Sequence, residues 1–114
     1  MLIRVRGVTL SQEGSFEVLE KDIENWLNKK VRDMGGISFK FVSPNNPGVP
    51  DRIYIFPEGR IYFVELKTEI GRMSNIQKWQ RQRLQAMGCQ FYLVKGMEQA
   101  REFIREIQHE VCTT

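Results

Sequence analysis

The stretch that decides the fold is GVPDRIYIFPEGRIYFVELK, residues 48–67. Its two halves, 52–56 and 60–67, are rich in the β-branched and aromatic residues that favour strands. The tripeptide between them begins with Pro57 and ends with Gly59, which suits a type I turn closed by a left-handed glycine. The stretch therefore predicts an antiparallel β-hairpin with a three-residue loop.

The length of this loop determines which side chains share a face of the hairpin. With a three-residue loop, Phe56 pairs with Arg60, and Asp51 lies across from Glu65, about 5 Å away at Cβ. Lys67, two residues further along the strand, points to the same face. A two-residue loop would instead place Asp51 opposite Leu66, so that Asp51 would no longer share a face with Glu65 and Lys67. The turn chemistry favours the first arrangement.

Hydrophobic periodicity predicts the other elements. The predicted helices span 15–34, 74–87 and 97–110, the further strands 2–6, 37–43 and 90–94, and a proline-rich loop 44–50. We expect 90–94 to be a central strand, because it is short and apolar. The helix 74–87, with Ser74 as N-cap and Gly88 as stop, has only a thin apolar stripe of Ile76, Trp79 or Gln80, Leu84 and Met87. The last helix places Ala100, Phe103, Ile104 and Ile107 inward.

The order helix, strand, strand, strand, helix, strand, helix predicts an α/β (α+β) fold, a mixed β-sheet flanked by helices. The 114 residues fit a single domain, 1–114. The first fifteen residues contain the short strand, but the polar segment after it is not assigned.

Composition excludes several classes of protein. With 41% hydrophobic and 27% charged residues and a net charge of +3, the chain is typical of globular domains and unlike disordered ones. It contains no apolar run of about 18 residues, so we expect no membrane span. The two isolated cysteines argue against a disulfide framework and a thiolate zinc site, and they predict a location in the reducing cytoplasm. The single histidine argues against a histidine metal site and a serine–histidine–aspartate triad. Any chemistry must therefore use carboxylates and lysine, with or without a carboxylate-bound metal.

Asp51, Glu65 and Lys67 are the candidates for this chemistry. Two carboxylates held close together in partly dry surroundings repel each other, and a divalent cation removes that penalty. Oxygen ligands favour Mg²⁺, Mn²⁺ or Ca²⁺ over zinc. A neighbouring lysine can orient or deprotonate a water, or stabilise charge developing on a phosphate. The set suits metal-assisted phosphodiester hydrolysis; the alternative is a plain ion pair between Glu65 and Lys67, with Asp51 initiating a turn.

The whole string resembles the PD-(D/E)XK nuclease signature, and more narrowly the VRR-NUC branch of that superfamily. The matching features are GVPD at 48–51, VELK at 64–67, GRMS at 71–74, Gln77 in the next helix and the acidic helix LEKDIENWL at 19–27. The resemblance covers about residues 20–95, and the small size is similar to that of the stand-alone, virus-type members.

This resemblance implies a restriction-endonuclease-like fold with the core order αβββαβ and nuclease activity that depends on Mg²⁺ or Mn²⁺. For stand-alone members it also implies homodimers that cut branched DNA such as Holliday junctions. It places the metal-binding acids on Asp51 and Glu65, a metal-binding backbone carbonyl on Leu66, the catalytic lysine on Lys67 and the motif glutamine on Gln77, near the scissile phosphate or a metal-bound water. The acid of the first helix falls on Glu20 or Glu24, of which Glu20 matches the family pattern better.

A basic run on the second predicted helix is the candidate DNA-binding surface. Lys78 and Arg81, together with Arg72 before the helix, could contact phosphates, with Lys40 as a weaker candidate; the alternative is a solvated charged face. Two other functions stay open: a nuclease directed to flaps or ends, or a nicking enzyme, and a non-catalytic nucleic-acid-binding or partner-binding module.

Overall fold

The computed structural model describes residues 3–5, 8–10 and 16–112. Its main sheet has the strand order β4-β5-β6-β7, made of β4 (Ile37–Lys40), β5 (Arg52–Phe56), β6 (Arg60–Lys67) and β7 (Gln90–Lys95). The first three strands are antiparallel, and β7 runs parallel to β6. Three helices, α1 (Glu20–Asp33), α2 (Asn75–Ala86) and α3 (Gly96–Cys112), complete this α+β fold. The predicted order of elements is confirmed.

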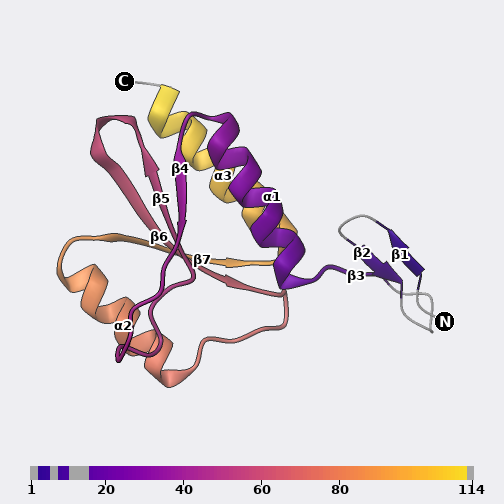
Figure 1. Ribbon diagram of the computed structural model, residues 1–114, viewed down its shortest axis with the longest axis horizontal. Helices are drawn as coiled ribbons and strands as arrows, with labels where there is room; N and C mark the ends of the chain where they lie inside the picture. The colour runs from indigo at the N-terminus through magenta and orange to yellow at the C-terminus, as the bar shows by residue number, and fades with distance from the viewer. Residues whose placement is uncertain (1–2, 6–7, 11–15, 113–114) are drawn as a thin grey trace.

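The sheet has two unlike faces. Helices α1 and α3 lie side by side over one face, and α2 lies on the other side of the sheet beside β7 (Figure 1). The core under α1 and α3 is built from alternate residues of the strands, including Tyr54 and Phe56 of β5 and Tyr62, Val64 and Leu66 of β6. The residues between them, among them Glu65, therefore point to the face where α2 lies.

The hairpin register is the predicted one. Phe56 pairs with Arg60 and Arg52 with Val64, so that Asp51, one residue before β5, lies across from Glu65. The turn itself differs from the prediction. In the short 3₁₀ segment η1 (Pro57–Gly59), Glu58 has a φ of 70° and Gly59 a φ of 72°. A type I turn has negative φ at both central positions, so the type I assignment was wrong, although the loop length was right.

The first helix begins later than predicted. α1 begins at Glu20, and Phe16 lies in a short strand, β3 (Phe16–Glu17), so the predicted helix 15–34 was wrong at its start. Leu19 is the N-cap, and its backbone N–H donates to the Asp22 carboxylate at 3.3 Å. This bond satisfies one of the amides that a helix start leaves unpaired. The predicted start at Ser15 lies outside the described residues.

Strand β7 and helix α2 also differ from expectation. β7 is an edge strand of the main sheet, not a central one. It is apolar because both of its faces are covered: Val94 packs into the core and Phe91 is buried near α2. On α2 the predicted apolar stripe was wrong in part, because Ile76 is 41% and Met87 83% exposed. At the position left open between Trp79 and Gln80, it is Gln80 that is buried. The Gln80 side chain donates to the Pro47 carbonyl at 3.0 Å and so ties α2 to the loop before β5.

The remaining predicted elements are confirmed with small shifts. Ser74 caps α2, and its hydroxyl accepts a hydrogen bond from the backbone N–H of Gln77 at 3.3 Å. Gly88, just after the helix, has a φ of 84°. The four residues predicted to face inward on α3 are buried. Near the N-terminus, β1 (Ile3–Val5) and β2 (Val8–Leu10) form a separate small antiparallel sheet with β3, whereas only the first of these strands was expected. Among the described residues, no helix is both long and apolar enough to cross a membrane.

Gly48 illustrates how the loop before β5 is fixed against α2. It has a φ of 84°, and a Cβ atom there would lie 2.9 Å from the backbone carbon and oxygen of Ile76. We therefore expect Gly48→Ala to lower the free energy of unfolding by about 2–3 kcal/mol, through a strained backbone and a backbone clash. Gly88→Ala is the matched control, because Gly88 has the same φ but open space around it. Its cost should be only about 1 kcal/mol. Equal losses in urea denaturation would show that α2 does not pack against this loop as described.

Candidate active site

Glu65 is the unusual residue of this structure. Its side chain is 1% exposed, on β6 and on the face opposite the α1–α3 core. Neither of its carboxylate oxygens has a hydrogen-bond partner within the described part of the chain. Burying a carboxylate without donors costs several kcal/mol, so a site of this kind is seldom kept for stability alone.

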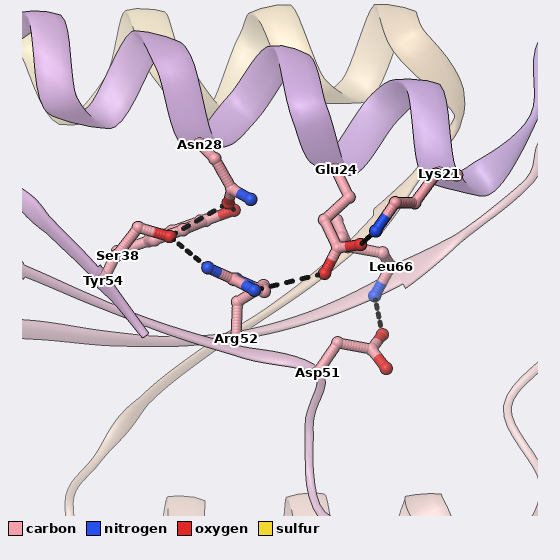
Figure 2. A network of polar contacts seen from close by, with 8 residues as sticks. All are labelled: Lys21, Glu24, Asn28, Ser38, Asp51, Arg52, Tyr54 and Leu66. Atoms are coloured by element: carbon pink, nitrogen blue, oxygen red, sulfur yellow. Dashed lines mark hydrogen bonds and ion pairs between the residues drawn. The ribbon is translucent and has the colours of Figure 1, made fainter. Parts of the chain in front are cut away.

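Asp51 faces Glu65 from the entry of β5. Pro50, just before it, is fully buried, and the Asp51 carbonyl accepts from the amide of Phe41 at 2.9 Å, so the backbone here is held on both sides. The Asp51 Oδ2 atom accepts a hydrogen bond from the backbone N–H of Leu66 at 2.8 Å (Figure 2). This bond links the start of β5 to β6 and fixes the Asp51 carboxylate next to the strand that bears Glu65.

The pKa of Glu65 reflects its burial close to a second carboxylate. Burial, and secondly the charge of Asp51, raise the pKa of Glu65 to about 8, and Lys67 opposes the shift. The Lys67 Nζ atom lies 3.5 Å from Glu65 Oε2. The ion pair of the simpler alternative is thus present, but within the described residues both Glu65 oxygens still lack a hydrogen bond, and the ion pair does not account for the second carboxylate. A bound cation would favour the charged form of both acids.

The donor set fits a hard divalent cation. Two carboxylates lie on one face of a hairpin, and no described residue donates a hydrogen bond to the buried oxygens of Glu65. In the described residues, no group of three or more histidine, cysteine, aspartate or glutamate side chains is arranged to hold a metal. This is compatible with Mg²⁺, which is usually bound by one or two carboxylates together with water and substrate phosphate.

The two candidate acids of α1 have different surroundings. The pKa of Glu20 is raised by burial first and then by the charge of Asp51, while Lys67 lowers it, so this carboxylate senses the Asp51–Lys67 centre. Glu24 instead forms ion pairs, with its Oε2 3.4 Å from Arg52 and its Oε1 3.6 Å from Lys21. The structure thus brings Glu20 toward the centre and engages Glu24 elsewhere.

A polar network beside Asp51 holds β5 against α1 (Figure 2). The guanidinium of Arg52, whose side chain is 11% exposed, donates to Glu24 and to the hydroxyl of Ser38. The Asn28 side-chain oxygen accepts from both Ser38, at 3.0 Å, and the Tyr54 hydroxyl, at 2.9 Å. The Arg52 side chain is therefore engaged in the interior of the fold. The network helps to fix the strand position at which Asp51 is presented.

Gln77 is engaged at the start of α2. Its Oε1 atom accepts from the backbone N–H of Ser74 at 2.9 Å, which completes a reciprocal capping box. This bond leaves the Nε2 group as the part of the side chain suited to a substrate oxygen. The sequence pattern predicted a site residue here, and the structure shows a capping residue on the first turn of α2.

Three of the four predicted DNA-binding residues line one cavity. Arg72, Lys78 and Arg81 surround a cavity of about 470 Å³ between α2 and β7, and Lys95 at the end of β7 completes its basic lining. Arg81 is held with its guanidinium carbon 5.3 Å from the centre of the Phe91 ring. Lys40, by contrast, pairs with Arg52 across β4 and β5, so its side chain starts from the opposite face of the sheet to Asp51. The structure does not bring Lys40 to this cavity.

The mixed sheet and the acid pair with its lysine define a restriction-endonuclease-like class of domain. A solved structure described as a "VRR_NUC domain" shares the fold with a TM-score of 0.71 at 24% identity, covering 75% of this chain and 94% of that one. The chain is also 40% identical over 81 residues to a protein named "Putative nuclease p44" from Acyrthosiphon pisum secondary endosymbiont phage 1. That match covers 71% of this chain and 87% of the phage protein. No family profile matches the sequence. The chain belongs to the VRR-NUC family.

Proposed function

We propose that this protein is a divalent-metal-dependent DNA endonuclease that hydrolyses phosphodiester bonds and prefers branched DNA. The observation that carries the proposal is the buried carboxylate of Glu65. It has no hydrogen-bond donor among the described residues, faces Asp51 and lies 3.5 Å from the ammonium of Lys67. The kinship with the phage protein named a nuclease supports the same reaction class. Together these features favour catalysis over a module that only binds nucleic acid.

The metal would be Mg²⁺ or Mn²⁺, held by the carboxylates of Asp51 and Glu65, the backbone carbonyl of Leu66 and the carboxylate of Glu20. When bound, such an ion lowers the pKa of a coordinated water and neutralises charge that develops on the phosphate. Glu65 and Asp51 lose their mutual repulsion on binding it. Their fixed backbone, tied by the Asp51–Leu66 bond, means that little reorganisation is needed.

Lys67 and Gln77 would act on the reacting groups directly. Lys67 is 18% exposed, so its ammonium can reach both Glu65 and a substrate in front of the acids. There it orients the attacking water or stabilises the charge on the phosphate in the transition state. Gln77 would donate its Nε2 group to the scissile phosphate while its Oε1 atom stays bonded to Ser74. Arg72, Lys78 and Arg81 would hold the DNA backbone without reading its sequence.

A homodimer would supply the second site that symmetrical cutting of a four-way junction requires. The described part of the chain offers an apolar surface for a second copy on the sheet face opposite α1 and α3. Ile37, Phe39 and Ile61 are 51%, 52% and 44% exposed there. Ile37 and Phe39 belong to β4, an edge strand of the main sheet, and Ile61 belongs to β6. Covering this face with a second copy would bury apolar side chains and an open strand edge together.

A cleavage panel tests the function. Four-way, flap, linear duplex and closed circular DNA would be incubated with the purified protein and Mg²⁺, Mn²⁺ or Ca²⁺, and the solution mass would be measured in parallel. We expect cutting of four-way DNA with Mg²⁺ or Mn²⁺ and a mass twice the 13.4 kDa of the chain. Cutting confined to flaps or ends would favour the alternative nuclease, and binding without cutting under any metal would favour the non-catalytic module. We also propose that the protein acts inside the cell, because both DNA and free Mg²⁺ are available there.

The roles of the two α1 acids can be separated. We expect Glu20→Gln to lower the cleavage rate about 10-fold or more while leaving stability nearly unchanged, because the side chain is exposed. Glu24→Gln should instead lower the free energy of unfolding by about 1–3 kcal/mol, because it leaves the largely buried Arg52 without its anion. Cleavage rates at saturating metal and urea melts of both variants are the measurements. The reverse pattern would assign the metal-binding acid to Glu24.

A further inference from the structure

The basic cavity beside α2 has an uncompensated charge. Arg72, Lys78, Arg81 and Lys95 contribute to its lining, and no acidic side chain among the described residues does so. Within those residues, none of the four lies within 4.0 Å of a carboxylate oxygen, whereas Arg52 and Lys67 each have such a partner. Gathered cations repel one another, so an anion that enters the cavity would relieve the repulsion.

The cavity adjoins the acid centre through the sheet. β6 and β7 run parallel in a register that places Leu93 beside Glu65 and Lys95 beside Lys67. Directly paired residues point to the same face, and neighbouring strands are about 4.8 Å apart. Leu93 and Lys95 also line the cavity. The cavity therefore begins one strand away from the pair Glu65–Lys67, on the same face of the sheet.

The shape and chemistry of the lining suit a phosphodiester. Arg81 is held against the Phe91 ring, so its guanidinium is pre-positioned, and a planar guanidinium favours phosphate oxygens. Lys95 is anchored at its backbone, where its N–H donates to the Gln99 side chain at 2.9 Å. The ammonium group is therefore carried by a fixed strand end instead of a loop.

We propose that this cavity binds the DNA phosphate that neighbours the scissile phosphate, and that Lys95 is the residue that positions it. The proposal rests on the proposed nuclease function and goes beyond it, because the sequence pattern gave Lys95 no role. One strand of the substrate then runs from the acid centre on β6 across β7, in the direction of Arg81. Binding in the cavity fixes the register of that strand relative to Glu65 and Lys67.

Equilibrium binding of DNA in Ca²⁺, as a function of salt, provides the test. Lys95→Gln should weaken binding about 10-fold and should lower the slope of log K against log salt by about 0.7–0.9, the contribution of one phosphate contact. Lys29→Gln on α1, whose ammonium is paired with Asp33, is the matched control and should leave both quantities unchanged. Thermal melts of both variants check that the fold is kept.

A neutral phosphate locates the contact. After the cut site is mapped with the unmodified protein, a methylphosphonate is placed at the phosphate on either side of the cut. The Lys95→Gln defect should vanish with one of these two oligonucleotides. A variant that binds like the unmodified protein, or a defect that persists with both neutral phosphates, would overturn the proposal. If the protein cuts no DNA but Lys95→Gln still lowers the salt slope, the nuclease function fails and the phosphate site stands.

Discussion

Replacement of Lys67 by alanine is expected to lower the metal-dependent cleavage rate by about 10³-fold, because a positioned proton donor or charge stabiliser contributes about 10²–10⁴-fold to catalysis. Asp51→Asn should have an effect of similar size. Its amide oxygen can still accept the hydrogen bond from Leu66, so the loss would report the missing charge and not a displaced strand. Single-turnover cleavage of four-way DNA at saturating Mg²⁺ is the measurement.

Two controls separate catalysis from folding in this experiment. Lys29→Gln removes a lysine from the exposed side of α1 and should cut at the unmodified rate. Binding of DNA to Lys67→Ala in Ca²⁺ should be weakened far less than its cleavage, because the proposed phosphate contacts of α2 are intact. If both Lys67→Ala and Asp51→Asn cut as fast as the unmodified protein, the assignment of the catalytic centre is wrong.

The second large effect concerns stability and has the opposite sign. We expect Glu65→Gln to stabilise the metal-free protein at alkaline pH. Burial and Asp51 raise the pKa of Glu65 from its usual 4.5 to about 8, so the folded protein holds this proton to higher pH than the unfolded chain does. The folded state therefore loses stability as pH rises through that window. The neutral amide of Gln avoids this loss, which amounts to roughly 3–5 kcal/mol for a shift of this size.

Thermal melts with a chelator present would show this difference. At about pH 5 the two proteins should melt at similar temperatures, and at about pH 9 Glu65→Gln should melt of order 10 °C higher. Added Mn²⁺ should raise the melting temperature of the unmodified protein and leave that of Glu65→Gln unchanged, because only the former gains an ion in the folded state. A variant less stable than the unmodified protein at about pH 9 would show that Glu65 is a structural ion-pair residue.

The hairpin and its register could be predicted from sequence because they depend on local rules. Pro57 and Gly59 set the loop length, and the loop length sets the pairing of Phe56 with Arg60. The alternation of side chains along each strand then determines which residues share a face. The opposition of Asp51 and Glu65 is a consequence of these two rules. The burial of Glu65 was suggested by the apolar residues before it, but the absence of donors around its oxygens required coordinates.

Other features depend on tertiary packing and were missed for that reason. The start of α1 was placed too early because Phe16 and Leu19 have helical spacing, whereas the side chain of Asp22 caps the helix at Leu19. β7 looked like a central strand because it is apolar, yet helices on both faces can bury an edge strand equally well. The sequence allowed either Trp79 or Gln80 to face inward, and Gln80 is the buried one because Pro47 offers it a carbonyl.

Lys95 shows where the sequence signal for the site ends. Like Lys67 on β6, it is the last residue of its strand, but the predicted strand ended at residue 94 and left Lys95 outside. Only the parallel pairing of β6 and β7 shows that the two lysines lie side by side on one face. The choice between Glu20 and Glu24 also required the structure, because it depends on the ion pair between Glu24 and Arg52, which the sequence does not show.

The central claim is that Asp51 and Glu65 together bind a hard divalent ion. An anomalous difference map from a crystal of the unmodified protein soaked in Mn²⁺ tests it most directly. We expect a single strong peak, or two adjacent ones, between these two carboxylates, and none at this place in a crystal of Glu65→Gln. Manganese bound elsewhere on the chain, with both carboxylates uncoordinated at saturating metal, would contradict the account.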